Sequence, residues 1–274
     1  MPYAEVNGVK LWYEIKGKGE PIAQIHGAGF GHDNFGMVSP ILAKKFQLLD
    51  YDMRGYGLSD RPIQEYSMEV WADDLAALMD HIGWDSAHIH GTSMGGMIAQ
   101  EFAIKYPEKT RTLIIGCSAC KCDETVKLTF RTWKRIAQTL GMGEEALAGI
   151  LATQALSRAF LDSPKGPETV KLIQEVMEKN NRVEVFSSAC DAMIRFDSTK
   201  QLKKIKAPTL IMAGNQDIMT PIDQGPKGGG SRVIHKMIRG SKLKIIKGCG
   251  HTFLFERPEE SARIITAFIN AHKK

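Results

Sequence analysis

The stretch HIHGTSMGGMIAQ, residues 88–100, constrains the fold of this chain more than any other segment. Ile89 lies in a short β-favouring run that breaks at Gly91, and apolar residues recur at helical spacing from Met94 onward. The pattern predicts a strand, a sharp turn and a helix. Ser93 stands at the predicted turn.

Ser93 is a candidate nucleophile. A serine hydroxyl reacts at neutral pH only if it is exposed, has a base to take its proton and has donors for the resulting oxyanion. A turn that lifts a serine off the end of a strand requires small residues two positions before and two after it, and Gly91 and Gly95 meet that demand. In a chain with 26 glycines, the same five residues are also compatible with a purely structural turn.

On both sides of a helical block described below, the chain alternates strands and helices at βαβ spacing. Such alternation predicts an α/β fold with a mostly parallel sheet flanked by helices. An N-terminal hairpin is expected over Asn7-Gly8, a strong turn dipeptide. Further strands are expected at 22–25, 46–51, 112–115, 209–213 and 243–246, and helices at 36–45, 67–82 and 258–271.

The alternation stops between residues 118 and 200, where only helical patterns occur. We interpret this block as a helical lid over one edge of the sheet, with most of its aromatic residues packed among its own helices. The chain then divides into a first part of the core (1–117), the lid (118–200) and a second part of the core (201–274). The lid helices are expected at 123–140, 144–161, 167–179 and 182–196.

Two polar residues follow late strands. Asp217 comes after 209–213 and His251 after 243–246, and the carboxyl ends of parallel strands carry the sites of open sheets. The chain order Ser93, Asp217, His251 therefore predicts a catalytic triad, in which His251 takes the serine proton and Asp217 orients the imidazole. The backbone N–H groups of Ala28 and Met94 are expected to bind the oxyanion.

Other charged residues also lie near strand ends. Asp123 and Glu124 follow the strand at 112–115 and are an alternative source of the acid, although Asp123 is distant from its strand and begins the predicted lid. Asp52 and Arg54 are expected to pair with one another in a structural role.

Composition narrows the class of protein. With 43% apolar and 24% charged residues, the chain is globular, and no apolar run approaches the roughly 20 residues of a membrane span. The N-terminus has no secretory pattern, and an odd number of cysteines, five, favours reduced thiols and a cytoplasmic protein. Cys117, Cys120 and Cys122 lack a second ligand pair at zinc spacing, so no metal is expected.

The net charge of +5 is concentrated in residues 198–247. No nucleic-acid motif accompanies it, so a solvated basic face is expected, with attraction of an anionic substrate as the alternative. The glycines at 27–31 lack the Lys-Ser/Thr of a phosphate loop and the six-residue dinucleotide fingerprint, so no cofactor is expected.

The chain resembles the α/β-hydrolases over its whole length. Residues 26–29 resemble their oxyanion loop, 52–59 the loop after the next strand, 91–95 the nucleophile elbow, 214–217 the acid loop and 250–251 the histidine loop. A less specific similarity, over residues 191–209, is to 3-oxoadipate enol-lactonases and related lid-bearing esterases. The segment 224–231, QGPKGGGS, departs from the family pattern and is expected to be flexible and basic.

This resemblance implies a cofactor-free serine hydrolase that cleaves a small carboxylic ester or lactone through an acyl-enzyme, with homo-oligomerisation left open. Carbon–carbon bond hydrolysis of a vinylogous diketone and ligand binding without turnover are the alternatives. A serine in place of aspartate at position 93 disfavours the haloalkane dehalogenase and epoxide hydrolase branches. The residues expected to contact the substrate are Phe30, His32, Trp133, Met193 and Phe253.

Overall fold

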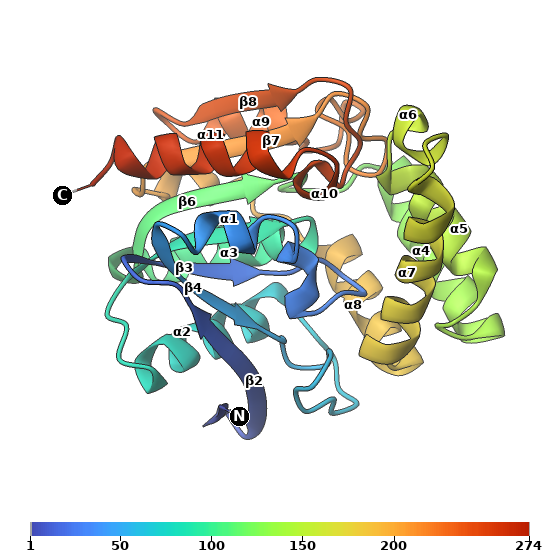
Figure 1. The fold of residues 1–274 in the computed structure, drawn as a ribbon, viewed down its shortest axis with the longest axis horizontal. Coiled ribbons are helices and arrows are strands. Elements are labelled where there is room, and N and C mark those ends of the chain that lie inside the picture. Colours follow the sequence, from blue (N-terminus) through green and yellow to red (C-terminus); the bar gives the residue numbers. More distant parts are fainter. Residues whose placement is uncertain (1, 274) are drawn as a thin grey trace.

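One eight-stranded sheet organises the protein in the computed structural model, which describes residues 2–273 (Figure 1). The strand order is β1-β2-β4-β3-β5-β6-β7-β8; β2 pairs antiparallel with β1 and β4, and the other neighbours pair in parallel. The α/β fold with a mostly parallel sheet is thus confirmed. The strands are β1 (Tyr3–Val6), β2 (Val9–Lys16), β3 (Glu20–Ile25), β4 (Phe46–Tyr51), β5 (Ala87–Thr92), β6 (Thr110–Gly116), β7 (Thr209–Gly214) and β8 (Lys242–Ile246).

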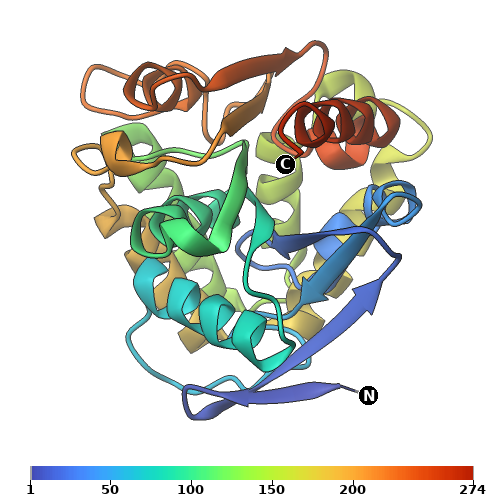
Figure 2. The ribbon, with the colours of Figure 1, turned by 90° about the vertical axis from the view of Figure 1, so that its left-hand side faces the viewer.

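Each face of the sheet is covered by its own apolar core. Because side chains alternate along a strand, Ile22 and Leu48 enter one core while their neighbours Ala23 and Leu49 enter the other. The helices α2 (Met68–His81), α3 (Met94–Lys105) and α9 (Ser231–Met237) cover the first face, and α1 (Ser39–Leu42) and α11 (Pro258–Asn270) the second, as Figure 2 shows along the sheet. Every residue of β5 is buried, so the strand before Ser93 lies in the middle of this sandwich.

Local sequence signals explain most element boundaries. Asn7 and Gly8 both adopt positive φ, at 49° and 76°, as the two-residue hairpin turn between β1 and β2 requires. Ser67 caps α2 by accepting a hydrogen bond from the Val70 N–H at 3.3 Å.

Four helical segments differ from expectation. The helix expected at 36–45 is only the four-residue α1, preceded by the 3-10 turn η1 (His32–Phe35), because the chain must turn back at Lys45 to enter β4. The helix expected at 144–161 is broken at Ser157, whose side chain caps a new helix by accepting from the Phe160 N–H. Two short helices, α9 and α10 (Phe253–Glu256), were not expected.

A helical insertion, α4 to α8, lies between β6 and β7 and projects from one end of the sheet (Figure 1). Within it α4 packs on α8 and α5 on α7. Its helices are α4 (Glu124–Leu140), α5 (Glu145–Ala155), α6 (Arg158–Leu161), α7 (Gly166–Asn180) and α8 (Val183–Arg195); the 3-10 turns η2 (Pro107–Lys109) and η3 (Leu202–Lys204) lie outside it.

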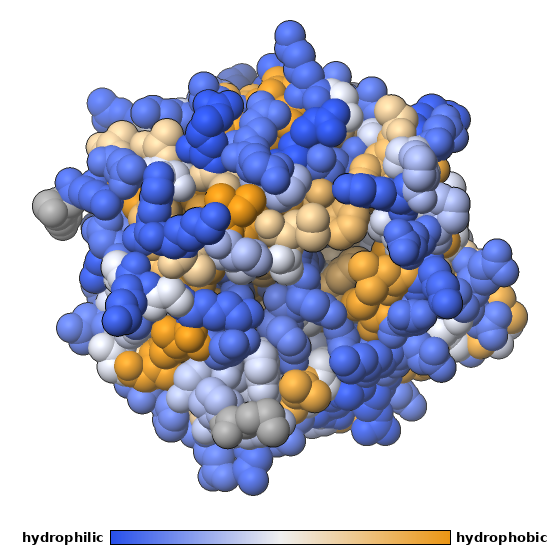
Figure 3. Space-filling model, viewed as in Figure 1, coloured by the Kyte–Doolittle hydropathy of each residue, from blue (hydrophilic) through white to orange (hydrophobic). Residues whose placement is uncertain are grey.

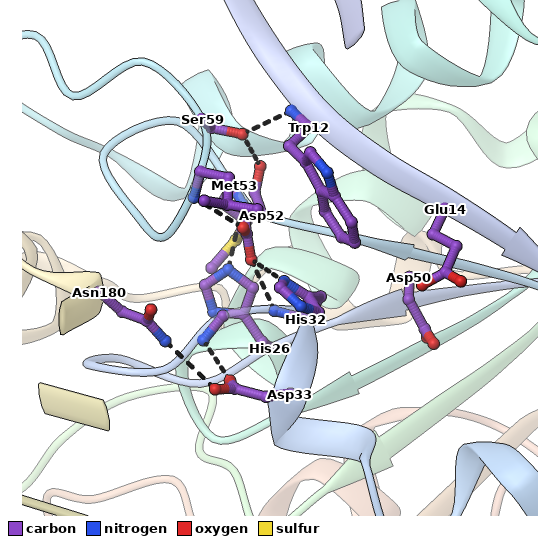
Figure 4. Close-up of polar contacts among 12 residues, drawn as sticks. Trp12, Glu14, His26, His32, Asp33, Asp50, Asp52, Met53, Ser59 and Asn180 are labelled. Carbon is purple, nitrogen blue, oxygen red and sulfur yellow. Dashed lines mark hydrogen bonds and ion pairs between the residues drawn. The ribbon is translucent and has the colours of Figure 1, made fainter. Parts of the chain in front are cut away.

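The prediction that Asp52 pairs with Arg54 is wrong. Arg54 donates from Nε and Nη2 to the two carboxylate oxygens of Asp74 in α2, at 2.7 Å each. Asp52 instead accepts from the backbone and ring of His32, at 2.6 and 2.9 Å (Figure 4). Burial opposes charge on both partners, yet their hydrogen bond lowers the pKa of Asp52 and raises that of His32. Both carboxylates therefore hold the loop after β4, each through its own partner.

No helix within residues 2–273 combines the length and apolar character that crossing a membrane requires.

Candidate active site

Ser93 occupies a strained turn between β5 and α3. Its φ of 56° lies in the left-handed region, which non-glycine residues rarely adopt, and its ψ is −122°. A Cβ on Gly91 would lie 2.0 Å from the Gly95 carbonyl oxygen, and one on Gly95 would lie 2.0 Å from that of Ile25. Only glycine therefore fits at either position, and the crossing of strand and helix holds Ser93 at the carboxyl edge of the sheet.

His251 and Asp217 meet at the same edge, on the loops after β8 and β7. The Nδ1 of His251 lies 2.9 Å from Oδ2 of Asp217, and both side chains are buried. Burial alone would lower the pKa of His251, but the Asp217 carboxylate and the Cys117 side chain raise it well above its ordinary value. Burial alone would raise the pKa of Asp217, but the charge and hydrogen bond of His251 lower it. Asp217 therefore favours the protonated form of His251, so the pair can carry opposite charges once the imidazole has taken up a proton.

The Asp217 carboxylate is held by its own loop. Its Oδ1 accepts from the N–H groups of Met219 and Thr220, at 2.9 Å each, which leaves Oδ2 to face His251. The Thr220 hydroxyl lies 3.0 Å from that Oδ2, 3.1 Å from Nδ1 of His251 and 2.9 Å from the Cys117 carbonyl oxygen. Thr220 therefore ties the acid and the histidine to the end of β6. Sequence reasoning missed this role, although the Thr220-Pro221 pair after Asp217 was its signal.

The other ring nitrogen of His251 has no such partner. Nε2 is buried and makes no hydrogen bond within residues 2–273, yet His251 and Ser93 line the same cavity. A buried polar atom without a protein partner is uncommon, and a catalytic role is one explanation for it. Nε2 is the atom that a general base would use.

The expected oxyanion loop lies beside Ser93. A Cβ on Gly27 would lie 3.3 Å from the Ser93 Cβ, and Ala28 lines the cavity. His26 holds this loop: its Nε2 accepts from the Met53 N–H at 3.0 Å, so Nδ1 carries the proton and donates to the Gly27 carbonyl at 2.9 Å (Figure 4). Burial lowers the pKa of His26, which favours this neutral form. Met94 is the first residue of α3, where helical N–H groups have no carbonyl partner within the helix.

A cavity of about 180 Å³ adjoins Ser93 and His251, and most of its wall is apolar. In Figure 3 a hollow lies between the core and the helical insertion, with apolar residues along the insertion side. The insertion contributes one aromatic side chain, six aliphatic ones and one hydroxyl: Trp133, Leu151, Ala155, Leu156, Leu172, Ile173, Val176 and Thr169.

Two of the five residues expected to contact the substrate, Phe30 and Trp133, line this cavity. The other three do not. His32 is bound to Asp52; Met193 is buried in the core that α8 shares with α4; Phe253 is buried in the core beneath the other face of the sheet. The helical pattern could not separate these roles, because apolar residues that face a cavity and those that face a core share the same spacing.

The alternative acid is engaged elsewhere. Asp123 caps α4 by accepting from the Val126 N–H, and its other oxygen accepts from the Gly225 N–H at 2.8 Å. The segment 224–231, which we expected to be flexible, is fastened here and pairs through the Gly229 carbonyl with the Cys120 N–H.

The histidine loop is also joined to the helical insertion. The buried Glu256 carboxylate accepts from the Gly250 N–H, next to His251, and from the backbone and hydroxyl of Ser157. The Thr252 N–H donates to the Ala155 carbonyl at 3.1 Å. These contacts connect the position of His251 to the start of α6 and the end of α5.

Within residues 2–273, no cluster of three or more His, Cys, Asp or Glu side chains is arranged to hold a metal ion. The five cysteines are buried and unpaired with one another.

Comparison with known proteins gives a consistent family. A model of the alpha/beta hydrolase fold matches residues 21–258. RutD of Azorhizobium caulinodans, whose name assigns it to carbamate hydrolysis, is 32% identical over 81% of this chain and 82% of its own length. The 3-oxoadipate enol-lactonase 2 of Acinetobacter baylyi is 31% identical over 66% of this chain and 65% of its own length. The crystal structure of an enol-lactonase from Burkholderia xenovorans superposes on this chain with a TM-score of 0.88. The superposition covers 98% of this chain and all of the enol-lactonase, and at 24% identity the similarity concerns the fold only.

Proposed function

Because the chain belongs to the alpha/beta hydrolase fold family and its named relatives are hydrolases, we propose that it is a serine hydrolase that cleaves a small carboxylic ester or lactone. The observation that carries this proposal is the unpartnered, buried Nε2 of His251, in the cavity that Ser93 lines. A histidine oriented by a buried carboxylate and lacking a partner for its other nitrogen is suited to accept a proton from a serine hydroxyl.

The reaction would begin when Ser93 Oγ attacks the carbonyl carbon of the ester as its proton passes to Nε2 of His251. The tetrahedral intermediate then collapses, the C–O bond to the alcohol breaks, and the alcohol oxygen takes the proton from His251. Water repeats the sequence: it gives a proton to Nε2, its oxygen bonds to the acyl carbon, and the bond to Ser93 Oγ breaks with return of the proton. The carboxylic acid is released and the enzyme is restored.

The charges that develop in these steps have counterparts in the site. Asp217 stabilises the imidazolium, since its Oδ2 lies 2.9 Å from Nδ1 of His251. The N–H groups of Ala28 and Met94 would bind the carbonyl oxygen as it becomes negative. In this account the helical insertion acts as a lid whose apolar wall excludes water from the acyl group.

The proposal is tested by hydrolysis of p-nitrophenyl esters and by labelling with a fluorophosphonate, which phosphonylates an activated serine. We expect both for the wild-type protein and neither for Ser93→Ala. Ser86→Ala, which removes a serine outside the cavity, is the matched control. Unchanged labelling of Ser93→Ala, or no labelling of the wild type, would refute the proposal.

A further inference from the structure

The cavity beside Ser93 offers no positive partner to an anionic substrate. No lysine or arginine of residues 2–273 lines it, and its only basic side chain is His251, which already faces Asp217. The basic segment 198–247 contributes a single residue to the wall, the uncharged Met219. Arg232 of that segment is exposed and pairs with Asp223 at 2.7 Å. The positive charge of the chain therefore lies away from this site.

A carboxylate stands at the cavity instead. Asp33 lines it and is exposed to solvent. Its oxygens accept from the Gly31 N–H at 3.1 Å and from the Asn180 side-chain amide at 3.4 Å, and both of these donors are neutral. An anionic substrate would meet repulsion at this residue.

The remaining wall is largely apolar and of limited size, and its other polar side chains, Asn34, Thr92, Thr169 and Thr252, are uncharged. Leu151 and Leu156 enter from the α5 side, Ile173 and Val176 from α7, and Leu254 from α10. The volume of about 180 Å³ compares with an engineered apolar cavity of about 150 Å³ that binds benzene. The space thus fits an apolar group of about six carbons.

We propose, on the basis of the serine hydrolase function above, that this site hydrolyses neutral esters or lactones with a compact apolar acyl group and discriminates against acyl groups that carry a free carboxylate. A carboxylate moved against the apolar wall would lose its hydration without gaining a cationic partner, which is unfavourable. If the substrate binds in the reverse orientation, with its acyl group on the side of Asp33, the substrate carboxylate is repelled by that of Asp33. The 3-oxoadipate enol-lactonase 2 of Acinetobacter baylyi acts, by name, on the enol lactone of a dicarboxylic acid, so this chain would differ from that relative in substrate charge.

A matched pair of esters isolates charge from shape. In p-nitrophenyl 4-methylpentanoate and p-nitrophenyl hemisuccinate, an isopropyl group and a carboxylate of similar shape occupy the same position. We expect kcat/KM to favour the neutral ester by about 100-fold, and any preference above tenfold supports the proposal. A preference below tenfold would overturn it.

A variant pair assigns the discrimination to the cavity. Leu172 lines the wall and is 47% exposed, so arginine can replace it without entering the core. We expect Leu172→Arg to raise kcat/KM for the hemisuccinate relative to the neutral ester at least about tenfold, because a guanidinium pairs with a carboxylate. Leu172→Gln, which is polar but uncharged, should change this ratio less than about threefold. A ratio unchanged by Leu172→Arg would contradict the assignment.

Binding of non-reacting amides distinguishes failure of this inference from failure of the proposed function. If neither ester is turned over and Ser93 is not labelled, hydrolysis is refuted. The charge preference is then read from titrations of 4-methylpentanamide and succinamate, followed by tryptophan fluorescence because Trp133 lines the cavity. Tighter binding of the neutral amide supports the inference, and equal or tighter binding of succinamate overturns it.

Discussion

The catalytic loops and the insertion wall of the cavity are built by different forces. The loops carrying Asp217 and His251 are fixed by directional hydrogen bonds, four of which reach the Asp217 carboxylate. The wall from α5 and α7 consists, apart from Thr169, of aliphatic side chains that pack without directional bonds. Directional bonds specify positions within tenths of an ångström, whereas packing specifies mainly volume and polarity. Changes in the loops should therefore affect rate, and changes in the wall should affect substrate choice.

The largest effect is expected from Asp217→Asn. We expect a loss of about three or more orders of magnitude in kcat with the fold retained, because an amide favours the wrong imidazole tautomer and cannot stabilise the cation. Asp123→Asn, which alters a carboxylate that caps α4, should stay within about tenfold of wild type. The kcat values of the two variants are compared at equal folded fraction, and circular dichroism measures that fraction. The reverse ranking would assign the acid to Asp123.

The pH profile sharpens this prediction. Only neutral His251 can act as base, and the Asp217 carboxylate outweighs the opposing effect of burial to raise its pKa above 6.5. Wild-type kcat/KM should therefore fall as the pH drops through an apparent pKa above 6.5, and this limb should move to lower pH in Asp217→Asn. Because folding raises the pKa of His251, its protonated form stabilises the folded state. This contribution to the free energy of unfolding is complete below pH 6.5 and is lost as the pH rises through the pKa of His251 in the folded protein.

Glu256→Gln weakens the contact between the two regions. Oε1 of Glu256 accepts from the N–H groups of Gly250 and Ser157, and Oε2 accepts from the Ser157 hydroxyl; an amide keeps one of these oxygens but loses the negative charge that strengthens the hydrogen bonds. We expect kcat to fall by about ten- to 100-fold, since His251 follows Gly250 directly. Glu259→Gln, at an exposed position in α11, is the control. Steady-state kinetics of both variants with one neutral ester provide the measurement, and equal rates would show that the two regions are independent.

A smaller effect is expected from Thr220→Val, which keeps the shape of the side chain but removes the hydroxyl beside Nδ1 of His251. We expect about a tenfold loss of kcat/KM and an acid limb shifted to lower pH, because the imidazolium loses one acceptor. Thr220→Ser retains the hydroxyl and should behave as wild type in both respects. An unshifted pH profile in Thr220→Val would limit the residue to a packing role.

The smallest effect on rate is expected in the wall. Ile173→Ala enlarges the cavity and should cost about 2–4 kcal/mol of unfolding free energy. Turnover of the acetyl ester should remain within about fivefold of wild type, while the preferred acyl chain lengthens by about two carbons. A series of p-nitrophenyl esters measures both quantities. Uniform loss across the series would indicate that the wall also positions the catalytic loops.

The same contrast explains what the sequence could predict. Ser93, Asp217 and His251 each follow a strand, and parallel strands bring their carboxyl ends to one edge, so their proximity follows from chain order. Helix α9 was hidden because its seven residues follow a glycine-rich stretch. His32 failed as a substrate contact because its partner, Asp52, is distant in sequence.

Side-chain direction within the helical insertion had no comparable signal. Trp133 and Met193 both occupy apolar positions of amphipathic helices, yet only Trp133 reaches the cavity. The choice depends on how α4 and α8 pack on each other and on the core, which is a tertiary property that helical periodicity does not encode.

The most direct test of the account is to locate the acyl group during turnover. Ser93 and the thiol-bearing Cys117 both line the cavity, so two nucleophiles are available to a substrate carbonyl. After acid quench of the enzyme with p-nitrophenyl 4-methylpentanoate, peptide mass spectrometry should find the acyl mass on the peptide that contains Ser93, with a matching burst of nitrophenolate. An acyl group on Cys117, or a burst without any adduct on Ser93, would contradict the account.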